Sequence, residues 1–162
     1  MLFRSGQVVL DAICQRWSWR RVVVACGPGN NGGDGLVIAK LLAEQGWPVQ
    51  VAVLSDLSDY KGDAAFHAAQ LPPTIPVLPL AQCDVSQADM VVDALFGAGL
   101  SRKLDELVQQ WLQAASDGKV PIIAVDVPSG VNGDTGADWG AVRAEDRKST
   151  RLNSSHSQQY RM

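Results

Sequence analysis

Three segments of the chain combine glycines with side-chain oxygens, a composition that can bind phosphate, hydroxyl groups or a cation. The first is CGPGNNGGDG at residues 26–35, which holds five glycines and two asparagines. Because Gly and Asn tolerate positive φ, successive N–H groups there can turn inward and bind an anion at a helix N-terminus. Gly27, Gly29 and Gly32 also fit GxGxxG, which alone is weak evidence, and a tight turn is the alternative interpretation. No Gly-Lys-Ser/Thr sequence follows, which argues against a P-loop nucleoside triphosphatase.

Two side chains of this segment, Asn31 and Asp34, carry oxygens that a plain phosphate loop does not need. An aspartate beside a diphosphate would repel it, so the Asp34 carboxylate is expected to face a hydroxyl group, a backbone N–H or a cation. Capping of the helix start explains Asp34 equally well. The sequence leaves both roles open.

The second segment, MVVDALFGAGLSRK, places Asp93 near the end of an apolar run. A carboxylate in such a run is expected to be paired, hydrogen-bonded or bound to a metal. Gly97 and Gly99 permit a close approach of backbone to a ligand. Arg102 and Lys103 could contact phosphates, or they could be solvated residues at the start of a helix.

The third segment, VDVPSGVNGDTG, again has an aspartate, Asp126, at the end of an apolar run. Two carboxylates on neighbouring strand ends, with Asn and Ser oxygens nearby, suit a hard cation that is bound only by oxygen. They also suit a ligand with hydroxyl groups. The alternative is structural, because Asp126 could form an Asx-turn over Ser129 and Gly130.

The elements that must position these segments alternate between strand and helix. Short apolar, β-branched runs predict buried strands, and apolar residues at helical spacing predict amphipathic helices. The predicted strands are 21–26, 49–54, 75–78 (a short edge strand interrupted by a proline), 90–95 and 121–127; the predicted helices are 7–17, 33–45, 61–71 and 104–116. This order predicts an α/β fold, a Rossmann-like three-layer α/β/α sandwich with a mainly parallel sheet. Such sheets bind ligands at the carboxyl ends of their strands.

Composition sets the class of protein. The 162 residues are 46% hydrophobic, enough for one domain with a core, and no apolar run has the length of a membrane span. We expect no membrane partner, and no secretory signal is visible at the start. The three cysteines, Cys14, Cys26 and Cys83, have no metal-binding spacing and predict reduced thiols, hence a cytoplasmic protein.

The last sixteen residues, 147–162, differ from the rest. They carry four basic residues and no acidic one, are rich in Ser, Gln and Asn, and lack apolar periodicity. A solvated basic tail or a nucleic-acid arm would have this composition, but the segment resembles translated adapter or vector sequence, and we predict an unstructured, artefactual tail. Residues 1–146 hold ten basic and seventeen acidic residues. This acidic body argues against nucleic acid as a partner.

The three segments together carry a specific resemblance. GPGNNGGDG, VDALFGAGL and VDVPSGVNGDTG, in this order and each after a predicted strand, resemble the YjeF N-terminal domain family, and the opening MLFRSG resembles that family's segment before its first long helix. The resemblance covers residues 1–146 and implies a domain that is incomplete at both ends. Enzymatic members of the family are NAD(P)HX epimerases, which interconvert the R and S forms of hydrated NADH and NADPH.

The resemblance also implies a set of site residues. It implies one potassium ion per subunit, held by Asn31, Asp93 and Ser129. The dinucleotide, a substrate rather than a cofactor, would contact Asn30, Asn31, Gly32, Gly33, Asp34, Gly97, Ala98, Gly99, Leu100, Ser101, Arg102, Lys103 and Asp126. A homodimer is compatible with the family, as is fusion to, or cooperation with, an NAD(P)HX dehydratase.

The chemistry of epimerisation needs an acid–base group at the C6 hydroxyl of the hydrated nicotinamide ring. The ring nitrogen can help to expel hydroxide, and a carboxyl group near that oxygen could protonate it and then deprotonate water that adds from the other face. We hypothesise that Asp126 is this catalytic group. Cys26 has no histidine near it in sequence and is interpreted as a small buried residue.

Two other functions remain open from the sequence. An NAD-dependent oxidoreductase would use an acid after the second strand for the ribose, and Asp56 is available, but this function explains neither NNGGDG nor the pair of aspartates at strand ends. A non-catalytic module is the other, because the resemblance extends to a domain of messenger-RNA decapping scaffolds. The acidic body and the intact motifs argue against that role.

Overall fold

The computed structural model describes residues 2–97, 103–125 and 149–151. Its strands form one parallel sheet. Its strand order is β3-β2-β1-β4-β5-β6, and all neighbouring strands run parallel. The strands are β1 (Val22–Cys26), β2 (Val49–Val53), β3 (Val77–Pro79), β4 (Met90–Ala94), β5 (Ile122–Ala124) and β6 (Ser149–Arg151). The first five confirm the predicted strands, including the edge position of the proline-interrupted one.

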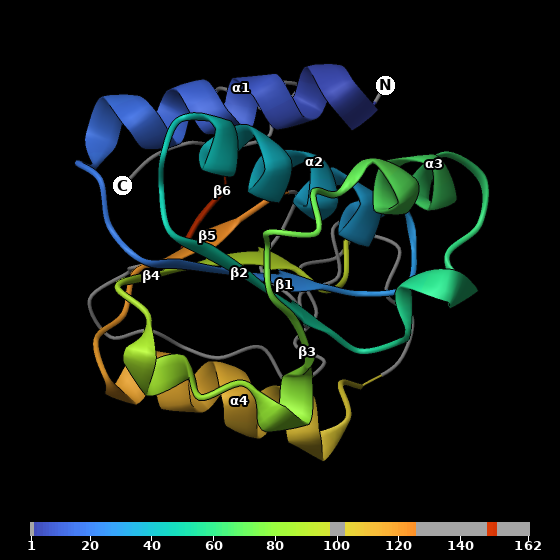
Figure 1. Cartoon of the computed structure of the whole chain (residues 1–162). Helices are drawn as coiled ribbons and strands as arrows, with labels where there is room; N and C mark the ends of the chain where they lie inside the picture. The colour runs from blue at the N-terminus through green and yellow to red at the C-terminus, as the bar shows by residue number, and fades with distance from the viewer. Residues whose placement is uncertain (1, 98–102, 126–148, 152–162) are drawn as a thin grey trace.

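Helices cover both faces of this sheet, as the predicted three-layer sandwich requires (Figure 1). On one face lie α2, α3 and, packed on α2, α1, whereas α4 lies on the other face. The helices are α1 (Leu2–Arg16), α2 (Asn30–Glu44), α3 (Gly62–Gln70) and α4 (Glu106–Asp117). The fold prediction is therefore confirmed.

The sheet separates two apolar cores. One packs α1 and α2 against one face of the strands, with Ile13, Ile38 and Val51 fully buried. The other packs α4 against the opposite face, around Trp111 and Val91. Because both faces are covered, the strands read as continuous apolar runs rather than alternating ones. The apolar side chains of the predicted strands are accordingly buried, among them Val22, Val24, Val51, Val53, Val91, Val92, Ile122 and Ala124.

Three short 3-10 helices were not predicted: η1 (Leu57–Asp59), η2 (Leu80–Gln82) and η3 (Val85–Gln87). Two of them share a signal, Asp-x-Ser, in which the aspartate side chain caps the turn. Asp56 Oδ1 accepts hydrogen bonds from the N–H and hydroxyl of Ser58, and Asp84 does the same with Ser86. These bonds lower the pKa of both carboxyl groups. The pattern could have been recognised as an Asx-turn.

The prediction of an unstructured tail is wrong for three residues. Ser149–Arg151 forms β6 and pairs in parallel with β5, in the register Ile122 to Ser149 and Ala124 to Arg151. The physical reason is that β5 would otherwise present unpaired backbone groups at the sheet edge, and any short extended segment can satisfy them. Residues 147–148 and 152–162 lie outside the described residues.

Candidate functional site

The described residues of the first two predicted segments lie at the carboxyl edge of the sheet, where β1 and β4 end. Ala25 pairs with Asp93, and the Gly27 N–H donates to the Ala94 carbonyl at 2.9 Å. On the far side of β4, the Val125 N–H donates to the Asp93 carbonyl at 3.1 Å. The first two glycine-containing segments therefore lie side by side, and the chain reaches this same edge at Val125, immediately before the third.

The turn at residues 27–29, here called the glycine turn, requires glycine for a reason that the sequence analysis missed. Within the described chain only Gly46 and Gly62 have positive φ among the glycines, so the predicted loop of positive-φ residues is wrong for this turn. Instead, the backbones approach closely. A Cβ on Gly27 would lie 1.8 Å from the Leu95 carbonyl oxygen, and a Cβ on Gly32 would lie 1.8 Å from the Gly27 carbonyl oxygen. Gly29 has open space around it.

The helix α2 begins at Asn30, three residues earlier than predicted, so NNGGD forms its first turns. Its N-cap is Gly29, whose lack of a side chain leaves the first N–H groups without a side-chain cap. Asp34 lies beyond the first turn, and the capping interpretation for it is wrong. An uncapped helix start directed at a strand edge is a suitable place for a phosphate, because its N–H groups and the helix dipole both favour an anion.

Two polar side chains at this edge are buried in a way that points to a ligand. Asp93 is 1% exposed, and one of its carboxylate oxygens accepts a hydrogen bond from the Leu95 N–H at 3.2 Å. The side-chain nitrogen of Asn31 is buried and, among the described residues, finds no hydrogen-bond partner. Burying an N–H donor without a partner costs free energy, so this nitrogen is suited to an acceptor oxygen of a bound molecule.

The other predicted contacts are distributed unevenly. Gly32 and Gly33 are buried under the glycine turn, Asn30 and Lys103 are exposed, and Gly97 is half-buried beside Leu95. The remaining predicted residues lie outside the described part of the chain: Ala98, Gly99, Leu100, Ser101, Arg102, Asp126 and Ser129. The candidate catalytic aspartate and one candidate potassium ligand are therefore not placed.

Two further residues at this edge come from the structure alone. Tyr60 is 4% exposed, and its hydroxyl donates to the Gly27 carbonyl at 2.6 Å. Burial, with a smaller contribution from nearby Cys26, raises the pKa of Tyr60, so the hydroxyl is protonated at neutral pH. Burial also raises the pKa of Cys26, which is fully buried as predicted. No local sequence signal marks Tyr60, because its partner is 33 residues away.

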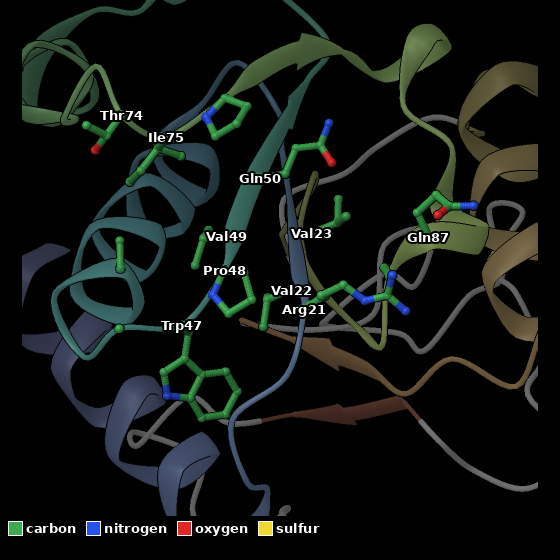
Figure 2. Close-up of a pocket in the computed structure, with 14 residues that line it drawn as sticks. Arg21, Val22, Val23, Trp47, Pro48, Val49, Gln50, Thr74, Ile75 and Gln87 are labelled. Carbon is green, nitrogen blue, oxygen red and sulfur yellow. The ribbon is translucent and has the colours of Figure 1, made fainter.

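Two cavities lie elsewhere along the sheet. One of about 550 Å³ lies at the amino ends of β1 and β2, lined by Trp47, Pro48, Gln50 and Ile75 among others (Figure 2). It holds none of the predicted site residues, and its Arg21 is already paired with Asp89 at 2.9 Å. The other, of about 410 Å³, lies at the carboxyl ends of β2 and β3 and includes Asp56.

The comparison with known families decides the assignment. The family model described as YjeF-related protein N-terminus matches residues 1–147. The chain belongs to this family. That match contains the glycine turn, Asp93 and the sequence of the third segment.

The YjeF-related chain is also similar to curated proteins. It is 38% identical over 147 residues to an NAD(P)H-hydrate epimerase of Rhodobacter capsulatus, which covers 85% of this chain and 69% of that protein. It is 35% identical over 142 residues to an NAD(P)H-hydrate epimerase of Leuconostoc mesenteroides, covering 87% of this chain and 64% of that protein. A bifunctional NAD(P)H-hydrate repair enzyme of Coxiella burnetii is 37% identical, and the chain spans 30% of its length.

The fold of this YjeF-related chain matches a solved structure as well. The crystal structure of the yeast protein YNL200c superposes with a TM-score of 0.71 at 22% identity, covering 93% of this chain and 76% of that one. At this level of identity the similarity establishes the fold alone. Among the described residues, no helix has the length and apolar character needed to cross a membrane.

Proposed function

We propose that this chain interconverts the R and S epimers of hydrated NADH and NADPH, as an isomerase in nicotinamide cofactor repair. The observation that carries the proposal is the placement of the glycine turn, the uncapped start of α2 and the buried Asp93 on one sheet edge, in a chain of the YjeF-related family. The similarity to proteins named NAD(P)H-hydrate epimerase supports the same reaction.

The start of α2 is proposed to bind the diphosphate of the dinucleotide. Its first N–H groups have no side-chain cap, and the helix dipole adds positive potential there. Gly32 lets the Gly27 backbone pack directly on this helix start, and Asn30 and Asn31 add hydrogen-bonding side chains. The segment after β4 is proposed to contact the ligand as well. Its residues are Gly97, Ala98, Gly99, Leu100, Ser101, Arg102 and Lys103.

A potassium ion is proposed to stabilise this edge. Among the described residues no three His, Cys, Asp or Glu side chains gather into a metal-binding group, and the proposed site combines a carboxylate with amide and hydroxyl oxygens. Asp93 supplies a buried carboxylate, and the side-chain oxygen of Asn31 is a second donor of the kind that hard cations prefer. With Ser129 they would hold the ion, which would supply positive charge beside the bound dinucleotide.

An NAD-dependent oxidoreductase is less consistent with the structure. That function would need Asp56 for the ribose, but Asp56 Oδ1 already accepts two hydrogen bonds from Ser58 as the cap of η1. It also leaves the burial of Asp93 without a role.

The proposed activity is tested directly with the purified chain. R-NADHX is mixed with the protein, and the appearance of the S form is followed chromatographically against a protein-free sample. Epimerisation faster than in that sample is the expected result. Oxidation or reduction of the nicotinamide ring would support the oxidoreductase, and binding of NADH without turnover would support a non-catalytic module.

The catalytic role of Asp126 has its own test. If Asp126 moves the proton at the C6 hydroxyl, the Asp126→Asn variant should lose about 10²–10⁴-fold in kcat while NADH binding, measured by calorimetry, is retained. An amide has nearly the shape of a carboxylate but cannot act as the base. A raised KM with near-normal kcat would assign Asp126 to substrate binding instead.

The potassium proposal is tested at Asp93. Asp93→Asn removes a formal charge from the proposed oxygen cage, so half-maximal activity should require more potassium, and the rise of melting temperature with potassium should shrink. Asp89→Asn is the matched control, because Asp89 lies at the amino end of β4 and pairs with Arg21. Equal responses of the Asp93 variant and the wild type would exclude Asp93 as a ligand.

The setting of the activity is also part of the proposal. The similarity to bifunctional repair enzymes supports fusion to, or cooperation with, an NAD(P)HX dehydratase. Three free cysteines are compatible with a cytoplasmic location. A homodimer remains a prediction that analytical ultracentrifugation can test.

A further inference from the structure

The Gly27 carbonyl is held from one side by a side chain that comes from a distant element. Tyr60 directly follows η1, and its hydroxyl donates to that carbonyl at 2.6 Å. The segment that delivers Tyr60 is itself fixed, because Asp56 caps η1 through Ser58. The ring is 4% exposed, so the hydroxyl is directed at this one carbonyl within the protein interior.

On its other side the same carbonyl faces the first turn of α2. A Cβ atom on Gly32 would lie only 1.8 Å from the Gly27 carbonyl oxygen. The glycine turn and the helix start are therefore in direct backbone contact, with no room to move against each other. The Gly27 N–H is held in turn by the Ala94 carbonyl of β4. Gly27 is therefore fixed between β4, Tyr60 and α2, and a displacement of its carbonyl would displace the first turn of α2 with it.

The helix start has no cap of its own that could do this work. Gly29, at the N-cap, has no side chain, and in the described structure no side chain caps this end of α2. In most helices a Ser, Thr, Asp or Asn at this position would hold the first turn and would also occupy one of its N–H groups. Here a distant hydroxyl holds the turn from the carbonyl side and leaves those N–H groups available.

We propose that Tyr60 is a positioning residue that holds the glycine turn and the first turn of α2 in the arrangement that binds the dinucleotide. The inference rests on the proposed function, since it assigns the first turn of α2 to the diphosphate. Tyr60 acts through Gly27 on affinity, and it takes no part in proton transfer.

The variant Tyr60→Phe tests this role, because it removes one oxygen and keeps the ring. Loss of one buried hydrogen bond is expected to weaken NADH binding by about tenfold and to raise KM for NADHX similarly, with kcat changed less than about twofold. Amide hydrogen exchange should become faster at Gly27, whose N–H donates to the Ala94 carbonyl, and at Gly33, whose N–H donates to the Gly29 carbonyl. The Kd is measured by calorimetry and the exchange by mass spectrometry on the full chain.

The matched control is Trp111→Phe. Trp111 is another buried ring whose N–H donates to a backbone carbonyl, that of Cys83 at 3.0 Å, but it lies in the core on the opposite face of the sheet. A general loss of stability would appear in both variants, whereas only Tyr60→Phe should change Kd and the exchange at the start of α2.

The outcomes separate the two proposals. Unchanged exchange at Gly27 and Gly33 in Tyr60→Phe, or equal changes in both variants, would overturn the positioning role whatever the enzyme does. An unchanged Kd in a chain whose wild type binds NADH would also overturn it. The wild type could also fail to bind NADH and to epimerise NADHX while Tyr60→Phe still exchanges faster. That result would retain the anchoring of the turn by Tyr60 and reject the proposed function.

Discussion

At the scale of single residues, two neighbouring strand ends bury groups of opposite character. Asp93 in β4 and Cys26 in β1 are both within 1% of full burial, and they lie one register position apart. Asp93 keeps a hydrogen-bonded carboxylate at the edge that carries the candidate site. Cys26 packs in the apolar core beneath α2, where a Cβ on Gly35 would lie 2.8 Å from its sulfur. One strand end is suited to ligand chemistry, and the other serves packing.

This difference predicts how the cysteines react. Burial raises the pKa of Cys26 and, with a smaller contribution from Asp84, that of Cys83, so both thiols should be protonated and inaccessible at pH 8. Cys14 is exposed. Iodoacetamide should alkylate Cys14 at least about 10²-fold faster than the other two, since these need local opening. Peptide mass spectrometry of a time course measures this, and adding urea should equalise the three rates. Fast alkylation of Cys26 in the folded protein would contradict its assignment to the core.

At the scale of elements, the contact between the end of β1 and the start of α2 determines the geometry of the candidate site. Only three residues separate the end of β1 from the start of α2. The last residue of β1 is also held from the β2 side, because the Leu54 N–H donates to the Cys26 carbonyl at 3.2 Å. A connection this short requires backbone to pack directly on backbone. The two demanding positions, Gly27 and Gly32, are those where a side chain would meet a carbonyl.

Two glycines of the GxGxxG pattern, Gly27 and Gly29, should therefore respond differently to alanine. Gly27→Ala places a methyl group against the Leu95 carbonyl and should cost about 1–3 kcal/mol of stability or more. Gly29→Ala meets nothing within 4 Å and has a φ of −98°, so it should cost less, about 0.5–1 kcal/mol, the loss expected for alanine at a helix N-cap. Urea unfolding followed by circular dichroism measures both. Equal losses for the two variants would mean that conformational freedom, rather than close approach, explains the glycines.

At the scale of the whole molecule, the sheet joins two apolar cores and is closed at one side by β6. That strand comes from the segment beyond the family match, which ends at residue 147. Its three residues pair with the backbone of β5, although they lie outside the part of the chain that matches the family. The arrangement is a case in which an available edge recruits a segment with little apolar character.

Two truncations measure what β6 contributes. Removing residues 147–162 exposes the edge of β5 and should lower the melting temperature by roughly 2–4 °C, the shift that a loss of about 1 kcal/mol produces in a domain of this size. Removing residues 152–162 keeps β6, and we expect no change. Differential scanning calorimetry of the two truncated chains is the measurement. No loss in the first would show that β6 adds nothing to stability and would favour the original expectation of an unstructured tail.

Much of the fold was predictable from residue pattern. Apolar β-branched runs located five strands, helical spacing located four helices, and glycine-rich segments after strands indicated the ligand-binding edge. These signals are local, because each strand or helix buries its own apolar side chains. The buried aspartate was predictable for the same reason, since Asp93 interrupts an apolar run.

Contacts between distant segments were settled only by packing in three dimensions. Four features depend on residues that are far apart in the sequence, so no local pattern could predict them. They are the start of α2 at Asn30, the close approach of Gly27 to Leu95, the hydrogen bond from Tyr60 and the pairing of β6. Glycine spacing is the same whether a turn needs positive φ or a missing Cβ, and only the neighbouring backbone distinguishes the two. A hydroxyl 33 residues from its carbonyl acquires its role when β2 and η1 are laid beside β1, because a hydrogen bond depends on distance in space and not along the chain.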